Sequence, residues 1–147
     1  MSEAVSTDEA VAAMARVDAF LAAWPYARFL GMQARLDAGG LIGVLPFSPH
    51  LVGNPLIPEL HGGVVGGFLE LTALAQLAAD AEGQRAPRTV DITIDYLRPA
   101  RDRVTYARPE VIKRGRRVAN LQVTAWQDDP KSPVATLRGH FVLRSAG

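Results

Sequence analysis

The chain has 147 residues, of which 48% are hydrophobic and 21% charged, a composition that indicates one folded domain and excludes a disordered chain. Its formal net charge of +1 excludes a global attraction to nucleic acid or to an anionic membrane. It has no cysteine, and no two of its three histidines have metal-ligand spacing on one helix, so we expect no disulfide, no metal and no other cofactor.

Residues 1–28 are predicted to form a helical extension at the amino terminus. Thr7, followed by Asp8 and Glu9, indicates a helix start with Thr7 as its cap, and Pro25 indicates the end of that helix. Residues 1–4 lack the basic start and the apolar run of a signal peptide, so we expect a cytoplasmic protein.

A hairpin and a long connection are predicted next. Residues 32–38 and 41–47 flank Gly39 and Gly40, a pattern typical of two strands joined by a tight glycine turn. Residues 48–60 contain several prolines and are predicted to be irregular, and loops of this length in compact domains are often functional.

The remainder of the chain predicts one long apolar helix and four strands. The helix begins near residues 61–63, runs to about residue 81 and is closed by Gly83; its most apolar part, residues 64–79, is too short to span a bilayer. The strands are predicted at 89–97, 103–113, 116–127 and 133–143, as an antiparallel meander. In the first of them the alternation predicts one buried face, formed by Val90, Ile92, Ile94 and Tyr96.

These elements predict an α+β fold in one domain, residues 1–147. An antiparallel sheet has one face that needs cover, and the long helix is the only predicted element able to cover it. We therefore expect five or six antiparallel strands wrapped around that helix.

Glu70 is unusual because it lies within the apolar helix, away from the helix's other polar residues. Its neighbours one turn away include Gly66 and Leu74, and poor hydration among such residues favours the neutral form of a carboxyl group. Carboxyl groups of this kind are candidates for a general base or a nucleophile. The alternative is a structural glutamate at an interface or surface that extends its carboxylate to water.

His61, Gly62 and Gly63 lie at the start of the same helix, where free N–H groups and the helix dipole favour negative charge. A glycine there allows a carbonyl group to approach the backbone closely, as in an oxyanion hole. The alternative is that these glycines serve only the turn geometry at the start of the helix.

The spacing of Gly62 and Glu70 limits how both residues can act. Eight residues along one helix separate them by about 12 Å, so one reacting carbon cannot contact both. Two such helices running antiparallel about a twofold axis would bring Gly62 of one chain beside Glu70 of the other. If both residues are catalytic, the protein is therefore at least a dimer.

The motif of residues 61–64 (HGGV), the acid at Glu70 and the strand end of residues 96–100 (YLRPA) together resemble the hotdog-fold acyl-CoA thioesterases of the phenylacetate-pathway type. The resemblance extends from about residue 29 to residue 143. It implies a hotdog fold, hydrolysis of an acyl-CoA thioester to a free acid and CoA, and dimers that pair into tetramers.

The resemblance also implies roles for individual residues. The Gly62 amide would polarise the thioester carbonyl, Glu70 would act as base or nucleophile, and His61 would shape the helix start and the pocket. Thr89, at the start of the following strand, would orient the attacking water. Gly63 would contact the substrate.

Two positions depart from the family pattern. The family often has an asparagine six residues before the histidine, where this chain has Pro55. Either the loop is shifted by one residue and the adjacent Asn54 contacts the substrate in its place, or the role of the asparagine is lost. Some relatives carry a threonine one turn after the acid, where this chain has Leu74.

Basic residues near residue 115 are predicted to bind the phosphates of CoA, given the resemblance. These residues are Arg114, Arg116 and Arg117. A second basic cluster lies at residues 98–103. No aromatic residues are interleaved with either cluster, so a nucleic-acid surface is not expected.

Two other functions fit parts of the sequence. His50, the proline-rich loop and Glu70 are similar to hotdog hydroxyacyl-thioester dehydratases, but the spacing from His50 to Glu70 is too long for that motif. The same fold also serves non-catalytic acyl-CoA-binding modules, which do not need a carboxylate at the substrate carbonyl.

Overall fold

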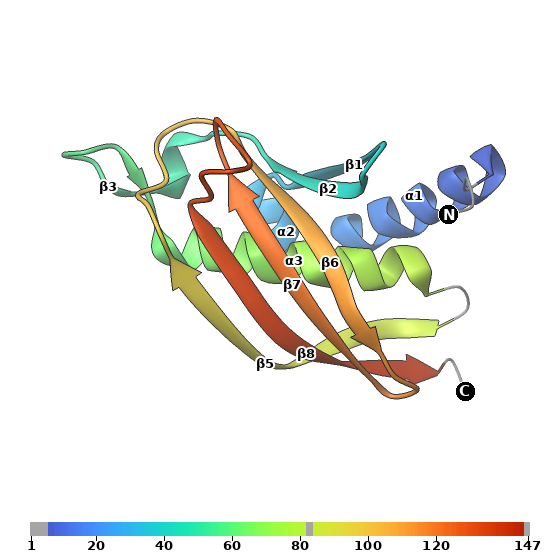
Figure 1. Cartoon of the computed structure of the whole chain (residues 1–147). Helices are drawn as coiled ribbons and strands as arrows, with labels where there is room; N and C mark the ends of the chain where they lie inside the picture. Colours follow the sequence, from blue (N-terminus) through green and yellow to red (C-terminus); the bar gives the residue numbers. More distant parts are fainter. Residues whose placement is uncertain (1–5, 82–83, 146–147) are drawn as a thin grey trace.

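The computed structural model of the chain describes residues 6–81 and 84–145. Within them, a long helix lies against a six-stranded antiparallel sheet of order β1-β2-β6-β7-β8-β5 (Figure 1). The helices are α1 (Thr7–Ala23), α2 (Pro25–Leu30) and α3 (Gly62–Asp80). The strands of this sheet are β1 (Gln33–Asp37), β2 (Gly40–Leu45), β5 (Gln84–Tyr96), β6 (Thr105–Arg114), β7 (Val118–Trp126) and β8 (Ala135–Ser145). The predicted hotdog architecture is confirmed.

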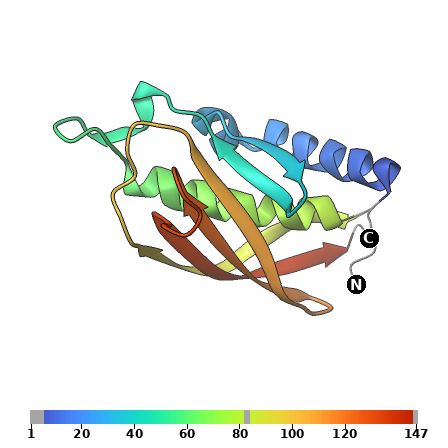
Figure 2. The same ribbon diagram turned by 45° about the horizontal axis from the view of Figure 1, so that its top comes forward.

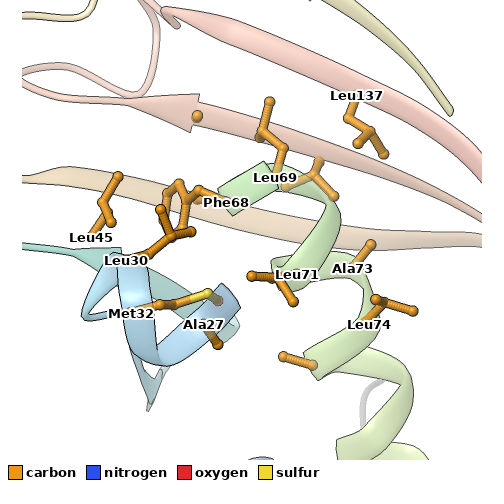
Figure 3. Packing of buried hydrophobic residues seen from close by; sticks show 14 of the residues in the cluster. Ala27, Leu30, Met32, Leu45, Phe68, Leu69, Leu71, Ala73, Leu74 and Leu137 are labelled. Carbon is orange, nitrogen blue, oxygen red and sulfur yellow. The ribbon is translucent and has the colours of Figure 1, made fainter. Parts of the chain in front are cut away.

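The helix α3 forms the centre of the core. Twelve of its residues are buried, and Phe68 points toward Leu30 and Leu45 (Figure 3). By length and composition α3 could cross a membrane, but 67% of its most apolar window is buried within the fold, as in the core helix of a folded domain. The predicted start of α3 is confirmed, whereas Gly83, its predicted end, and residues 1–4 lie outside the described residues.

The amino-terminal segment differs from the prediction in two details. The cap of α1 is Ser6, whose side chain accepts a hydrogen bond from the Glu9 N–H at 3.1 Å, so the predicted cap at Thr7 was one residue too late. Pro25 follows the end of α1 and also begins α2, which was not predicted; the fixed φ of proline suits the first position of a helix. Figures 1 and 2 show α1 and the β1–β2 hairpin on one side of α3 and β5 on the other.

The predicted four-stranded meander was wrong in the position of β5. This strand pairs with β8 at the edge of the sheet, while β6 pairs with β2 and β7. The connection between β5 and β6, residues 97–104, therefore crosses from the edge of the sheet to a position between β2 and β7. Crossing over instead places β5 and the β1–β2 hairpin at opposite edges of the sheet, with α3 between them.

The predicted buried face of β5 was also partly wrong. Ile92 and Ile94 are packed against the core, but Val90 is 58% exposed. The register with β8 shifts between Thr89 and Asp91, which is a β-bulge at Val90. Because the bulge reverses the alternation, Thr89 pairs with the fully buried Phe141 and shares the inner face of the sheet.

The connection from β2 to α3 is more ordered than the irregular loop predicted. It contains a short 3-10 turn (Pro49–Leu51) and a two-stranded sheet of β3 (Val52–Asn54) and β4 (Glu59–Leu60). The tip of this hairpin projects beyond the amino-terminal end of α3 in Figure 1, and Leu56 at the tip is 91% exposed.

Candidate active site

The first turn of α3 leaves one backbone donor free. His61 caps the helix: its Nδ1 atom accepts the Gly63 N–H at 2.9 Å, and its carbonyl oxygen accepts the N–H groups of Val64 and Val65 at 2.9 and 3.1 Å. Among the described residues, no group accepts the Gly62 N–H. Since a helix start concentrates partial positive charge, this N–H is a donor ready for a developing anion.

Close packing holds His61 in this position. The His61 N–H donates to the Leu51 carbonyl oxygen at 2.9 Å, which ties the helix start to the 3-10 turn. On the other side lies Gly53, where an added Cβ would stand 2.8 Å from the His61 Cα atom. The absence of a side chain at Gly53 therefore lets the β3–β4 hairpin lie directly against the capping residue.

A cavity of about 490 Å³ opens beside the free amide. One wall is the first turn of α3, and the opposite wall is the end of β5 with residues 97–100. Glu59, Gly62, Gly63, Tyr96, Leu97 and Arg98 are among the residues that line it. Gly62, the residue with the free N–H, is thus part of the wall of this cavity.

Glu70 lies two turns further along α3 and is half-buried. It shares a partly exposed stripe of the helix with Gly63 and Gly67. Within the described residues, no hydrogen bond or ion pair involves its carboxylate. Because α3 is continuous from Gly62 to Asp80, the separation of about 12 Å between Gly62 and Glu70 holds, and one chain does not bring the two residues together.

Thr89 faces α3 from β5. A Cβ added at Gly66 would meet Ile94, and one added at Gly62 would contact Tyr96, so β5 and α3 run in opposite directions. Four helical residues and two strand residues each cover about 6 Å. By this spacing Glu70 is level with Ile92, and Thr89 lies about one helical turn beyond Glu70.

The predicted substrate contacts Asn54 and Gly63 already have partners. The Asn54 side chain accepts the Leu56 N–H at 3.1 Å within the tip of the β3–β4 hairpin. The Gly63 N–H donates a hydrogen bond to His61 Nδ1, and the Gly63 carbonyl oxygen accepts a hydrogen bond from the Tyr26 hydroxyl. Gly63 lines the cavity, whereas Asn54 lies in the projecting hairpin.

The predicted phosphate-binding arginines lie at the other end of α3. Arg114 contacts Asp80, the last residue of α3, at 3.5 Å, whereas Arg116 and Arg117 line a cavity of about 590 Å³ with Lys113 and His140. Gly62 and Asp80 are separated by about 27 Å along the helix, so one chain does not bring these arginines to its own Gly62.

The second basic cluster, residues 98–103, contacts other parts of the same chain. Arg103 pairs with Asp128 at 2.8 Å, and Arg98 and Arg101 donate to backbone carbonyl groups.

His50, the histidine of the alternative dehydratase motif, uses both ring nitrogens. Nδ1 lies 2.8 Å from the Ser48 hydroxyl, and Nε2 lies 2.8 Å from the Phe29 carbonyl oxygen. The ring also packs edge-on against Phe29. Neither nitrogen is free to exchange a proton with a substrate, so the geometry argues against a dehydratase that uses His50.

Comparison with known proteins settles the family. Residues 59–134, more than half of the chain, match the thioesterase superfamily. The chain belongs to the thioesterase superfamily. It is therefore a thioester hydrolase, as the sequence motifs predicted.

Individual relatives agree with this assignment. The thioesterase is 27% identical over 143 residues to the medium/long-chain acyl-CoA thioesterase YigI of Salmonella typhimurium, a match that covers 88% of this chain and 91% of YigI. A crystal structure of a Chromobacterium violaceum protein is 36% identical with a TM-score of 0.73, covering 97% of this chain and all of that one. The Escherichia coli PaaI protein of the phenylacetic acid degradation operon shares the fold, with a TM-score of 0.74 at 20% identity over 91% of this chain and 94% of PaaI.

Two residues of the thioesterase's site were missed in the sequence. The Tyr96 hydroxyl donates to the Gly62 carbonyl oxygen at 2.7 Å, and the Tyr26 hydroxyl donates to the Gly63 carbonyl oxygen at 3.3 Å. The sequence feature that could have indicated them is the pair Gly66 and Gly67. Glycine is unfavourable inside a helix, so its presence there indicates that another group packs closely against the helix. Tyr96 lies against the first of these glycines and Tyr26 against the second.

Proposed function

We propose that this thioesterase hydrolyses acyl-CoA to a free acid and CoA, with Gly62 and Glu70 as its catalytic residues. The observation that supports this most strongly is the unpaired Gly62 N–H at a helix start beside a cavity. The YigI relatives are medium/long-chain acyl-CoA thioesterases, which supports medium- and long-chain acyl-CoA as the first substrates to try.

The chemistry follows from the two groups. In the transition state the thioester carbonyl oxygen becomes an oxyanion, which the Gly62 N–H and the helix dipole stabilise. The Glu70 carboxylate either deprotonates a water that attacks the carbonyl carbon, or attacks it directly and forms an anhydride that water then hydrolyses. In both routes the C–S bond breaks, and CoA leaves as a thiolate that takes up a proton.

A single site then requires two subunits. Gly66 is midway between Gly62 and Glu70, so a twofold axis at the level of Gly66 relates antiparallel helices in which Gly62 of each chain meets Glu70 of its partner. Two features support such a pairing. β5 is an edge strand whose outer backbone groups pair with no other strand in the described part of the chain, and several large apolar side chains are exposed near the amino-terminal end of α3. These side chains are Tyr26, Phe29, Leu56, Ile57, Tyr96 and Leu97.

The same pairing gives the basic residues a role. In the partner chain, Asp80 and the β6–β7 turn beside it are about 15 Å beyond the partner's Glu70. Arg116 and Arg117 of that chain would bind the CoA phosphates at the end of an extended pantetheine arm. Assembly into dimers or tetramers and a cytoplasmic location stay predictions.

A panel of acyl-CoA substrates tests the proposed function. We expect thiol release from saturated acyl-CoA, and weaker release from acyl-N-acetylcysteamine thioesters, because these lack the CoA phosphates. The measurement is the initial rate of thiol formation. Hydration of a trans-2-enoyl-CoA without thiol release would support the dehydratase, and binding of every substrate without turnover would support a binding module.

Replacing Thr89 by Ala is expected to lower kcat about tenfold, less than a replacement of Glu70, because a hydroxyl that orients water assists the reaction but is not its base. Thr93 is a matched control, since it lies on the outward face of the same strand. Steady-state kinetics of Thr89→Ala and Thr93→Ala measure the difference. Equal effects of Thr89→Ala and Glu70→Ala would show that Thr89 does more than orient water.

A further inference from the structure

The peptide unit between Gly62 and Gly63 is held at both ends. Its carbonyl oxygen accepts a hydrogen bond from the Tyr96 hydroxyl at 2.7 Å, and its N–H donates to His61 Nδ1 at 2.9 Å. His61 precedes this peptide in the chain, whereas Tyr96 is at the end of β5, 34 residues away. The contact from Tyr96 is therefore a tertiary restraint on the first peptide of α3.

Tyrosine rings approach the first turns of α3 from two sides. A Cβ on Gly66 would stand 3.0 Å from the Tyr96 hydroxyl oxygen, and a Cβ on Gly67 would overlap the Tyr26 ring. The Tyr26 hydroxyl donates to the next carbonyl, that of Gly63. The Tyr26 hydroxyl is protonated at neutral pH, as an ordinary tyrosine is, and burial raises its pKa further.

The restraint matters because the candidate oxyanion donor is a glycine. Glycine has the largest range of φ and ψ angles, and an oxyanion donor stabilises the transition state only if it is held in place before the reaction. Fixing the peptide that follows Gly62 limits its ψ angle, while the capping contacts of His61 fix the chain before it. The backbone on both sides of the Gly62 N–H is then fixed, at the cavity that Gly62 and Tyr96 both line.

We propose that Tyr96 is a positioning residue whose hydroxyl holds the Gly62 amide in the orientation that binds the oxyanion. This inference rests on the proposed function, in which Gly62 is the oxyanion donor. Tyr96 is 56% exposed, so its packing contributes little to the core, and its hydroxyl connects it to α3 by a hydrogen bond.

Tyr96→Phe tests the inference, because it removes the hydroxyl and keeps the ring. We expect kcat for acyl-CoA hydrolysis to fall about tenfold, the size of one lost neutral hydrogen bond, with KM, Tm and oligomeric state unchanged. The matched control is Tyr106→Phe, since Tyr106 lies on the outer face of β6 beside Trp126. The inference would be overturned if Tyr96→Phe had the same kcat as Tyr106→Phe. It would also be overturned if the fall in kcat of Tyr96→Phe came with a marked fall in its Tm.

A spectroscopic readout separates positioning from a general loss of structure. With a 13C-labelled thioester bound to a Glu70→Gln background, the infrared carbonyl frequency reports the hydrogen bond from Gly62. We expect a lower frequency than in free substrate, and a return toward the free value when Tyr96→Phe is added. If adding Tyr96→Phe leaves the carbonyl frequency of the bound substrate unchanged, the inference is overturned while the proposed function stands. Absence of acyl-CoA hydrolysis by the unaltered enzyme would instead remove the proposed function.

Discussion

Replacing Glu70 by Gln is expected to lower kcat for acyl-CoA hydrolysis by about a thousandfold, because the amide keeps the shape of the side chain but cannot accept a proton or attack a carbonyl. Glu70 has no partner among the described residues, so the change breaks no ion pair or hydrogen bond there. Tm and the oligomeric state should therefore stay close to those of the unaltered enzyme. Stopped-flow or steady-state thiol release measures the rate.

Glu110→Gln is the control for this prediction. Glu110 is exposed on the outer face of β6, and the substitution removes the same charge on the side of the sheet away from α3, so the rate should not change. If Glu70→Gln alters KM but leaves kcat intact, Glu70 binds substrate without acting as base or nucleophile. If it lowers Tm strongly, its role is structural.

The central parts of the fold could be predicted because their sequence patterns are local. The long apolar run of residues 64–79 predicted α3, and the runs of β-forming residues at 103–113, 116–127 and 133–143 predicted β6, β7 and β8. The order of the strands and the bulge at Val90 could not be predicted in this way. Both depend on which strand pairs with β5, and that pairing joins residues about fifty positions apart.

The residues of the candidate site also differ in whether the sequence could predict them. Gly62 and Glu70 could be found from the sequence because both lie on one helix, where spacing gives direction and distance. The contact of Tyr96 with Gly62 could not, since it depends on where the end of β5 meets the helix. The arginines near residue 115 were chosen for their charge, which gave no information about their position at the far end of α3.

Replacing Gly62 by Pro is expected to lower kcat by about a hundredfold to a thousandfold, the usual effect of removing one oxyanion-hole donor. Gly62 is the first residue of α3, a position where proline fits a helix, and the ψ angle of 134° at His61 suits a residue before proline. The substitution thus removes the free N–H while the helix start is kept. Circular dichroism and Tm check that the fold is intact.

Gly62→Ala is the matched control, because it adds a carbon but keeps the N–H. The added Cβ would stand 3.6 Å from the Tyr96 hydroxyl oxygen, an ordinary contact, so the rate should fall only slightly. Equal losses in Gly62→Pro and Gly62→Ala would attribute the effect to bulk in the cavity and argue against the amide as the oxyanion donor.

Mixing the two inactive variants tests whether each site is shared between subunits. After exchange in equal amounts, half of the dimers contain one Glu70→Gln chain and one Gly62→Pro chain. In such a dimer one site joins the intact Gly62 of the first chain to the intact Glu70 of the second, and the other site lacks both groups. We therefore expect recovery of about a quarter of the unaltered activity, measured by thiol release once mass spectrometry confirms exchange. If exchange is complete and no activity returns, each chain contains its own site, and Gly62 and Glu70 do not act on one carbonyl.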